Sequence, residues 1–273
     1  MQYVLGNMLN GGGVAGIDPD AKAYINTIVS AGATVTSAQR NAINTFYKTA
    51  KKDGFYTPIK RFYLPIWGVA APNAVDLITT ASGTFVGGVT HGAGFIQGNG
   101  TTGRFDLGVS PDTLGLVDGS ASLSTLVYAS QVGTGFRVVY GVTQVSPARK
   151  NLRLSRLGTT TGIEFGVGAN NASDTNFNGI YIGSETASNS RYSRVRRSGG
   201  VTSLATNTTS STGGYPTINA QVMAANNSGN FANFSSDQIG SAHIGVAMTT
   251  TQADAFTAAL KTLWETCTGL TLP

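Results

Sequence analysis

Cysteine and histidine are scarce in this sequence. Cys267 is the single cysteine among 273 residues, which excludes an intrachain disulfide and a metal cluster built from cysteine thiolates. It lies in a stretch with helical periodicity, so we expect a buried structural thiol. The two histidines, His91 and His243, have no local spacing to carboxylates that would predict a zinc site. His243 alternates with apolar neighbours, and we expect it on an exposed strand face.

Charge is also sparse. Eighteen basic and 13 acidic residues give a net charge of +5, and the charged fraction is 11%, less than half of the usual share of about 25%. A nucleic-acid binder would show a dense basic stripe interleaved with aromatic residues, so we expect no nucleic-acid partner. No apolar run approaches the length of a membrane span, and no secretory signal pattern is visible. Gly, Ser, Thr and Asn replace the missing charge, as in all-β extracellular or particle-bound proteins.

Helical periodicity is confined to the two ends of the chain. Asp18 followed by Pro19 predicts the start of a first helix. The capping-box pair Thr36 and Gln39 begins a second apolar stripe, which predicts a helical hairpin. An aromatic-rich connector over residues 55–67 is expected to pack onto whatever follows.

The C-terminal end repeats the same signals. Thr249 and Gln252 have capping-box spacing, and an apolar stripe from Phe256 to Cys267 follows at helical intervals. Gly269 is placed to end this helix. We expect a C-terminal helix that packs back on the rest of the chain.

Between residues 70 and 248 the pattern changes to short alternating runs separated by Gly, Asn and Ser clusters. Many short strands with regular turn signals predict an antiparallel jelly-roll sandwich. The absence of a fixed internal period argues against a solenoid or propeller. The expected strands include residues 123–129, 136–142, 152–157, 163–167, 180–182, 192–197, 201–205, 218–222 and 242–248.

The first ten residues form a separate apolar piece, because the glycines at 11–13 follow them as a hinge. A frayed terminus is one interpretation. The other is a segment that docks on a partner or a neighbouring subunit through Tyr3, Val4, Leu5, Met8 and Leu9. We predict two parts: residues 1–69, the docking segment and helical hairpin, and residues 70–273, the sandwich with its C-terminal helix.

Three segments carry a family resemblance. They are residues 21–67, including SAQRNAINTFYKTAKKDGFYTPIKRFYLPIWG; residues 75–108, VDLITTASGTFVGGVTHGAGFIQGNGTTGRFDLG; and GIYIGSETASNS (179–190) with ANNSGNFANFSSDQIGSAHIGVAMTTTQADAFTAALKTLW (225–264). In this order the chain resembles bacteriophage tail, fibre and head-associated proteins that carry a concanavalin A-like (laminin G-like) jelly roll. The motifs are patterns of small residues, and no ligand residues are carried over from the family.

The resemblance implies a structural protein of the virion, such as a capsid decoration or tail-fibre component, that assembles in the host cytoplasm. Its expected partners are other virion proteins and further copies of itself, because virion proteins occupy symmetric positions. One alternative is a receptor-binding adhesin for host attachment that recognises surface polysaccharide. A second alternative is a carbohydrate-active enzyme.

The concanavalin A-like family also contains glucanases, which need two carboxylates that flank the scissile bond. Related β-glucanases draw them from one strand with an E-x-D-x-x-E pattern. The three glutamates, Glu164, Glu185 and Glu265, lack that spacing. Glu164 also alternates in opposite phase to its apolar neighbours, as a solvated outward residue does. We therefore expect the chain not to be an enzyme.

A glycan-binding site would stack a sugar ring on an exposed aromatic side chain and bind its hydroxyls through Asn or Asp. Aromatic residues and asparagines occur together in predicted loops, where each aromatic could equally pack in the core. The candidates are Phe177, Tyr215, Asn226, Asn227, Phe231, Asn233 and Phe234.

We predict no cofactor and no catalytic residues. A structural calcium ion is the one alternative, because lectin-type sandwiches bind hard cations through loop oxygens. Asp and Asn also favour turns, and we prefer to interpret the two candidate groups of Asp and Asn residues as turn residues. The groups are Asp106, Asp112 and Asp118, and Asn170, Asn171 and Asp174.

One strong basic cluster stands out, made by Arg191, Arg194, Arg196 and Arg197. A solvated outer face or a charge-protected edge strand is the interpretation we prefer. Contact with an acidic neighbouring subunit or an anionic polysaccharide is the alternative.

Overall fold

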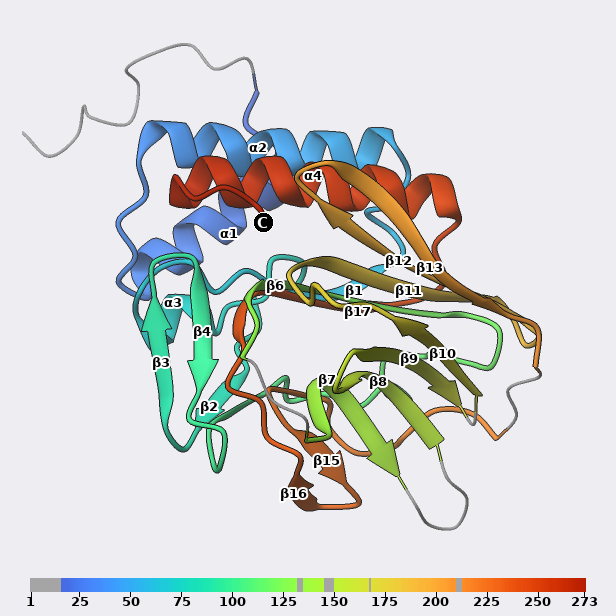
Figure 1. The fold of residues 1–273 in the computed structure, drawn as a ribbon. Helices are drawn as coiled ribbons and strands as arrows, with labels where there is room; N and C mark the ends of the chain where they lie inside the picture. The colour runs from blue at the N-terminus through green and yellow to red at the C-terminus, as the bar shows by residue number, and fades with distance from the viewer. Residues whose placement is uncertain (1–15, 132–134, 145–149, 167, 210–212) are drawn as a thin grey trace, which may run out of the picture.

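The computed structural model describes residues 16–131, 135–144, 150–166, 168–209 and 213–273. Two β-sheets lie face to face, and three helices form a further layer over one of them (Figure 1). The predicted fold class, an antiparallel sandwich with an N-terminal helical hairpin and a C-terminal helix, is confirmed.

The sheet that lies under the helices is here called the helix-covered sheet. Its spatial order is β13 (Gly200–Asn207), β12 (Ser190–Arg197), β11 (Gly179–Ala187), β6 (Ala121–Ala129), β17 (Gln238–Gly245), β4 (Phe95–Gly98) and β3 (Val89–Gly92), and β1 (Ile59–Tyr63) also pairs with β17.

The second sheet is here called the outer sheet. Its order is β10 (Gly168–Ser173), β9 (Thr160–Gly166), β8 (Lys150–Leu157), β7 (Arg137–Gln144), β14 (Gln221–Val222), β5 (Arg104–Asp106) and β2 (Thr84–Val86). The hairpin of β15 (Ala225–Asn227) and β16 (Asn230–Ala232) joins it, with β15 parallel to β7 over two residue pairs.

The helices begin where their capping residues were predicted. α1 (Pro19–Ser30) is capped by the Asp18 carboxylate, which accepts a hydrogen bond from the Asp20 backbone N–H at 3.0 Å. Capping boxes precede α2 (Ser37–Lys52) and α4 (Thr250–Thr268) at Thr36 and Thr249. A short helix, α3 (Ala70–Asn73), completes the set in the described chain.

The helices pack on the helix-covered sheet through a cluster of phenylalanines. Phe62 of β1 lies 5.4 Å from Phe46 of α2 and 5.6 Å from Phe256 of α4, measured between ring centroids. Gly240 lets α4 approach the sheet, since a Cβ there would lie 2.8 Å from Trp264 Nε1. With this space open, the Trp264 Nε1–H donates a hydrogen bond to the Gly94 carbonyl at 2.9 Å.

A second core lies between the two sheets and contains the inward residues of both. Leu123, Tyr181, Tyr140 and Ile163 are examples, each 0–1% exposed. Buried apolar area of this kind is the main stabilising term of a sandwich.

The predicted connector over residues 55–67 contains a strand. Residues 59–63 form β1 and pair with β17. The division between residues 1–69 and 70–273 stays a prediction, although β1, which precedes it, is part of the helix-covered sheet.

The prediction of an exposed His243 is wrong. His243 is 0% exposed and its ring lies 5.1 Å from that of Phe256. Alternation did place it opposite Ala242 and Ile244, which face the core between the sheets. The opposite face is buried as well, because α4 covers it.

The interpretation of the arginine cluster as a solvated face is also wrong. Arg194 Nη1 lies 2.8 Å from Asp254 Oδ2 of α4, and Arg196 Nε donates to Thr257 Oγ1 at 3.0 Å. Arg197 binds Asp174, and Arg191 pairs with Glu185. The cluster therefore forms contacts within the chain.

Candidate functional site

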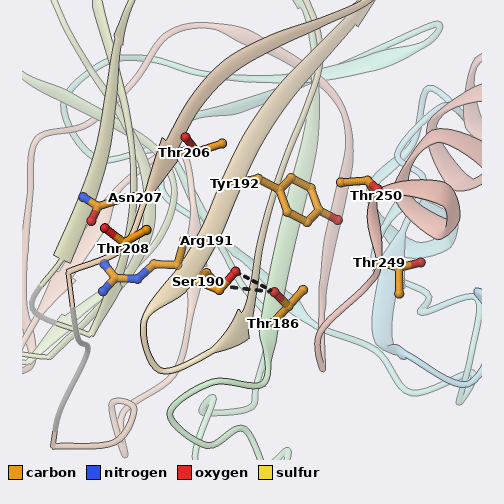
Figure 2. A pocket seen from close by; sticks show the side chains of 9 residues that line it. All are labelled: Thr186, Ser190, Arg191, Tyr192, Thr206, Asn207, Thr208, Thr249 and Thr250. Atoms are coloured by element: carbon orange, nitrogen blue, oxygen red, sulfur yellow. Dashed lines mark hydrogen bonds between the residues drawn. The ribbon is translucent and has the colours of Figure 1, made fainter.

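A cleft of about 430 Å³ opens at the rim of the helix-covered sheet (Figure 2). The turn between β11 and β12, the end of β13 and the start of α4 form its walls. Its lining residues are Thr186, Ser190, Arg191, Tyr192, Thr206, Asn207, Thr208, Thr249 and Thr250.

Local structure explains why hydroxyl groups gather in the cleft. The pairing of β11 with β12 shifts register between Glu185 and Ala187, so Thr186 falls at an irregularity. Its Oγ1 lies 3.2 Å from Ser190 Oγ and 3.4 Å from the Ser190 carbonyl oxygen, the contacts dashed in Figure 2. On the opposite wall, Thr249 caps α4 and Thr250 is the first helical residue.

Tyr192 forms an aromatic part of this lining. Its hydroxyl donates a hydrogen bond to the Met248 carbonyl at 2.7 Å, and burial raises its pKa well above the usual value. The ring therefore stays neutral at physiological pH. The threonine hydroxyls offer hydrogen bonds to a neutral ligand with several hydroxyl groups, and Tyr192, which is 8% exposed, adds a small apolar surface.

Behind the cleft lies a buried charged pair. Arg191 Nε is 3.2 Å from Glu185 Oε1, without the alignment of a hydrogen bond, and both side chains are fully buried. The Tyr215 hydroxyl and the Gly119 backbone N–H, at 3.0 Å, both donate to Glu185 Oε2. The pair fixes the end of β12 against β11.

Two of the predicted glycan-binding aromatics lie in the core. Phe177 and Tyr215 are each 1% exposed. Phe177 packs against the Tyr181 ring at 4.8 Å, and Tyr215 binds Glu185. The prediction that they stack on a sugar is wrong, because neither ring face is open.

The other five candidates come together in and beside the β15–β16 hairpin. Asn226 is buried, and its side chain bonds the Asn219 carbonyl and the Gly229 N–H within the turn. Phe231 is half-buried, with the Arg104 guanidinium 3.7 Å from its ring centroid. The remaining three, Asn227, Asn233 and Phe234, are half-buried or exposed. A glycan role for these five stays a prediction.

The proposed docking residues Tyr3, Val4, Leu5, Met8 and Leu9 lie outside the described residues. Glu164, expected to be solvated, is half-buried and holds Arg153 Nη2 at 2.8 Å.

Three of the residues weighed as calcium ligands, Asp106, Asp118 and Asp174, accept hydrogen bonds from other protein groups, whereas the buried Asn170 amide has no hydrogen-bond partner in the described chain. Asp118 accepts a hydrogen bond from the Gly214 N–H at 3.0 Å, and Asp106 accepts one from Gly108 at 2.8 Å. Asp174 binds Arg197 and the Tyr181 hydroxyl. Within the described ranges, no three His, Cys, Asp or Glu side chains are grouped as metal ligands would be.

No sequence pattern predicted the cleft. Its walls come from segments about 60 residues apart, and threonine has no characteristic spacing in a binding site.

Among the helices of the described chain, none is long and apolar enough to cross a membrane.

No family model matches this chain. No curated protein matches it either. Solved structures are similar to this chain. A Trypanosoma rangeli sialidase in complex with 2,3-difluorosialic acid is 11% identical with a TM-score of 0.50, and the match covers 81% of this chain and 39% of the sialidase chain. The binding domain of botulinum neurotoxin serotype D is 7% identical with a TM-score of 0.45, over 75% of this chain and 52% of that domain.

The expectation that this chain is not an enzyme is corrected by this comparison. The sandwich is found within a sialidase chain, so an enzyme can contain this fold. At 11% identity the likeness extends to the fold alone and assigns no reaction to this chain. This chain spans about two fifths of the sialidase chain, given the 39% that is covered.

Proposed function

We propose that this chain is a bacteriophage virion structural protein, a head- or tail-associated component that displays its sandwich on the particle surface. The three segments that resemble phage particle proteins support it, together with a composition of 11% charged residues. The proposed partners are other virion proteins and further copies of the chain, assembled in the host cytoplasm.

The proposal is carried by the difference between the two sides of the fold, one helical and one formed by strands and loops. α1, α2 and α4 lie on one side of the helix-covered sheet, and the outer sheet with the β15–β16 hairpin lies on the other (Figure 1). A particle that holds the chain by its helical side would present the outer sheet and its loops to solvent. Electron microscopy of intact particles, labelled with an antibody against the sandwich, tests the proposal, and we expect surface label.

A second candidate function is a receptor-binding adhesin that recognises host surface glycans. The cleft beside Tyr192 favours it, because the threonine hydroxyls that line the cleft can bind the hydroxyls of a sugar.

Filling the cleft should then abolish glycan binding. We expect the wild-type chain to bind members of a glycan array that includes sialosides, and Thr206→Trp to lose at least about tenfold in affinity, about 1.4 kcal/mol. Thr202→Trp is the matched control, since Thr202 is also exposed on β13 but does not line the cleft. Equal binding by both variants would rule out the cleft, and no binding by the wild type would reject the adhesin.

A further inference from the structure

Two arginines face each other on neighbouring strands of the outer sheet. Arg137 of β7 and Arg156 of β8 are paired directly in the register, so their side chains lie on the same face of the sheet. That face points into the sandwich, because Leu154, two residues before Arg156, belongs to the core between the sheets. Arg156 is 9% exposed and Arg137 is half-buried. Like charges directly opposite each other destabilise a sheet unless a counter-charge lies between them.

No carboxylate of the chain supplies that counter-charge. All 13 acidic residues lie within the described ranges, and none of them forms an ion pair with Arg137 or Arg156. Buried charges in proteins are paired or bind an ion, because an isolated charge is costly to remove from water. Other arginines of the described chain follow this rule and pair with Asp or Glu: Arg61, Arg153, Arg191, Arg194 and Arg197.

Each of the two guanidinium groups also keeps a buried nitrogen without a hydrogen-bond partner in the described chain, Arg137 Nε and Arg156 Nη1. Their other contacts are to neutral groups. Arg137 Nη2 donates to the Gln131 carbonyl at 2.7 Å, and Arg156 Nε donates to the Gly158 carbonyl at 2.8 Å. The Arg156 guanidinium lies 4.9 Å from the ring centroid of Phe177. These contacts position the two groups without neutralising their charge.

Neutral hydrogen-bonding groups continue the same face of the sheet. Thr161 of β9 is paired directly with Arg156, and Asn170 of β10 lies diagonally across from Thr161. Thr161 and Asn170 are 1% and 2% exposed. Neither the Thr161 hydroxyl nor either amide atom of Asn170 has a partner in the described chain. Because buried polar groups are costly without partners, their gathering beside two arginines indicates a ligand that supplies the partners.

We propose that the two paired arginines, with Thr161 and Asn170 beside them, bind a small dianionic oxyanion, hydrogen phosphate, between the sheets. Two guanidinium groups bring two positive charges, which a dianion neutralises and a monoanion does not. The Thr161 hydroxyl and the Asn170 amide nitrogen donate to the phosphate oxygens, and Asn170 Oδ1 accepts a hydrogen bond from its P–OH group. Since three of the four side chains are almost fully buried, the site accepts a free ion and not a phosphate carried on a polymer.

Calorimetric titration of inorganic phosphate into the full chain tests the site, at mildly alkaline pH and with chloride of matched ionic strength as the blank. We expect a single bound phosphate. Arg137→Gln should weaken its binding at least about tenfold, because one of two positive charges and a charge-assisted hydrogen bond are lost. The absence of phosphate binding by the wild type would overturn the proposal.

Arg104→Gln is the matched control. Arg104 is also half-buried with an Nε that has no partner in the described chain, but it lies on β5 and on the opposite face of the outer sheet from the core residue Phe105. This variant should bind phosphate as the wild type does. An equal loss of binding in Arg104→Gln and Arg137→Gln would contradict a site at the paired arginines.

Thr161→Val separates ligand binding from a structural role. Its hydroxyl has no partner in the described chain, so its removal should raise the urea midpoint in chloride. Phosphate should then raise the midpoint of the variant less than that of the wild type, because a bound ligand stabilises the folded chain by mass action. The general salt effect of phosphate is common to both chains. An equal rise in both would contradict the proposal.

Discussion

The Arg191→Met variant is expected to lose about 3–5 kcal/mol of unfolding free energy, the usual cost of leaving one charge of a buried ion pair behind. Arg191 and Glu185 are both 0% exposed as side chains, with 3.2 Å between Nε and Oε1. Without the guanidinium, the carboxylate remains in a low-dielectric environment without its counter-ion. Urea denaturation followed by circular dichroism at pH 7 measures the loss.

Two further variants define this effect. Glu185→Gln combined with Arg191→Met should cost less than Arg191→Met alone, because no charge stays buried. Lys261→Met removes the cation of a half-exposed pair, with Glu265 Oε2 at 2.6 Å, and should cost about 0.5 kcal/mol or less. If Arg191→Met and Lys261→Met cost the same, the buried pair does not hold β12 in place.

His243 should make the protein sensitive to acid below pH 6.5. Its burial lowers the pKa to about 3, and neither ring nitrogen has a hydrogen-bond partner in the described chain. The unfolded chain therefore binds a proton near pH 6.5 that the folded chain does not accept. The stability is complete above that pH and falls by about 1.4 kcal/mol per pH unit until the folded pKa is reached.

The His243→Leu variant tests this slope. Between pH 7 and pH 4.5 the wild type should lose about 3 kcal/mol more unfolding free energy than the variant, from two pH units below 6.5. His91→Gln is the matched control, because burial also lowers the pKa of His91 but that side chain is only half-buried. Parallel pH profiles for the wild type and His243→Leu would mean that His243 is not kept neutral by burial.

Local signals account for the elements that sequence reasoning placed well. The Thr36–Gln39 and Thr249–Gln252 pairs mark helix starts through hydrogen bonds made within four residues, and both capping boxes form. The alternating runs identified the long central strands in the same way. The short strands before residue 110 could not be recognised from the sequence pattern, because three or four residues show too little alternation.

Burial of strand faces could not be predicted, because it depends on distant segments. The local sequence predicts that Arg194 and Arg196 are solvated. In the structure they bind Asp254 and Thr257 of α4, which follows about 60 residues later in the chain. His243 is covered by the same helix. Likewise, Phe177 and Tyr215 occur in loop-like sequence but fill the core. Alternation gives the side of a strand on which a residue lies, and not what covers that side.

We propose that this sandwich stands on the surface of a phage particle. Immunogold electron microscopy of intact, purified particles tests it most directly, using an antibody raised against the outer sheet and its loops. The same antibody pre-absorbed with the purified chain is the control. We expect gold at regular positions on the head shell or on the tail and its fibres, without disruption of the particles. Particles that show no more gold than the pre-absorbed control would contradict the claim.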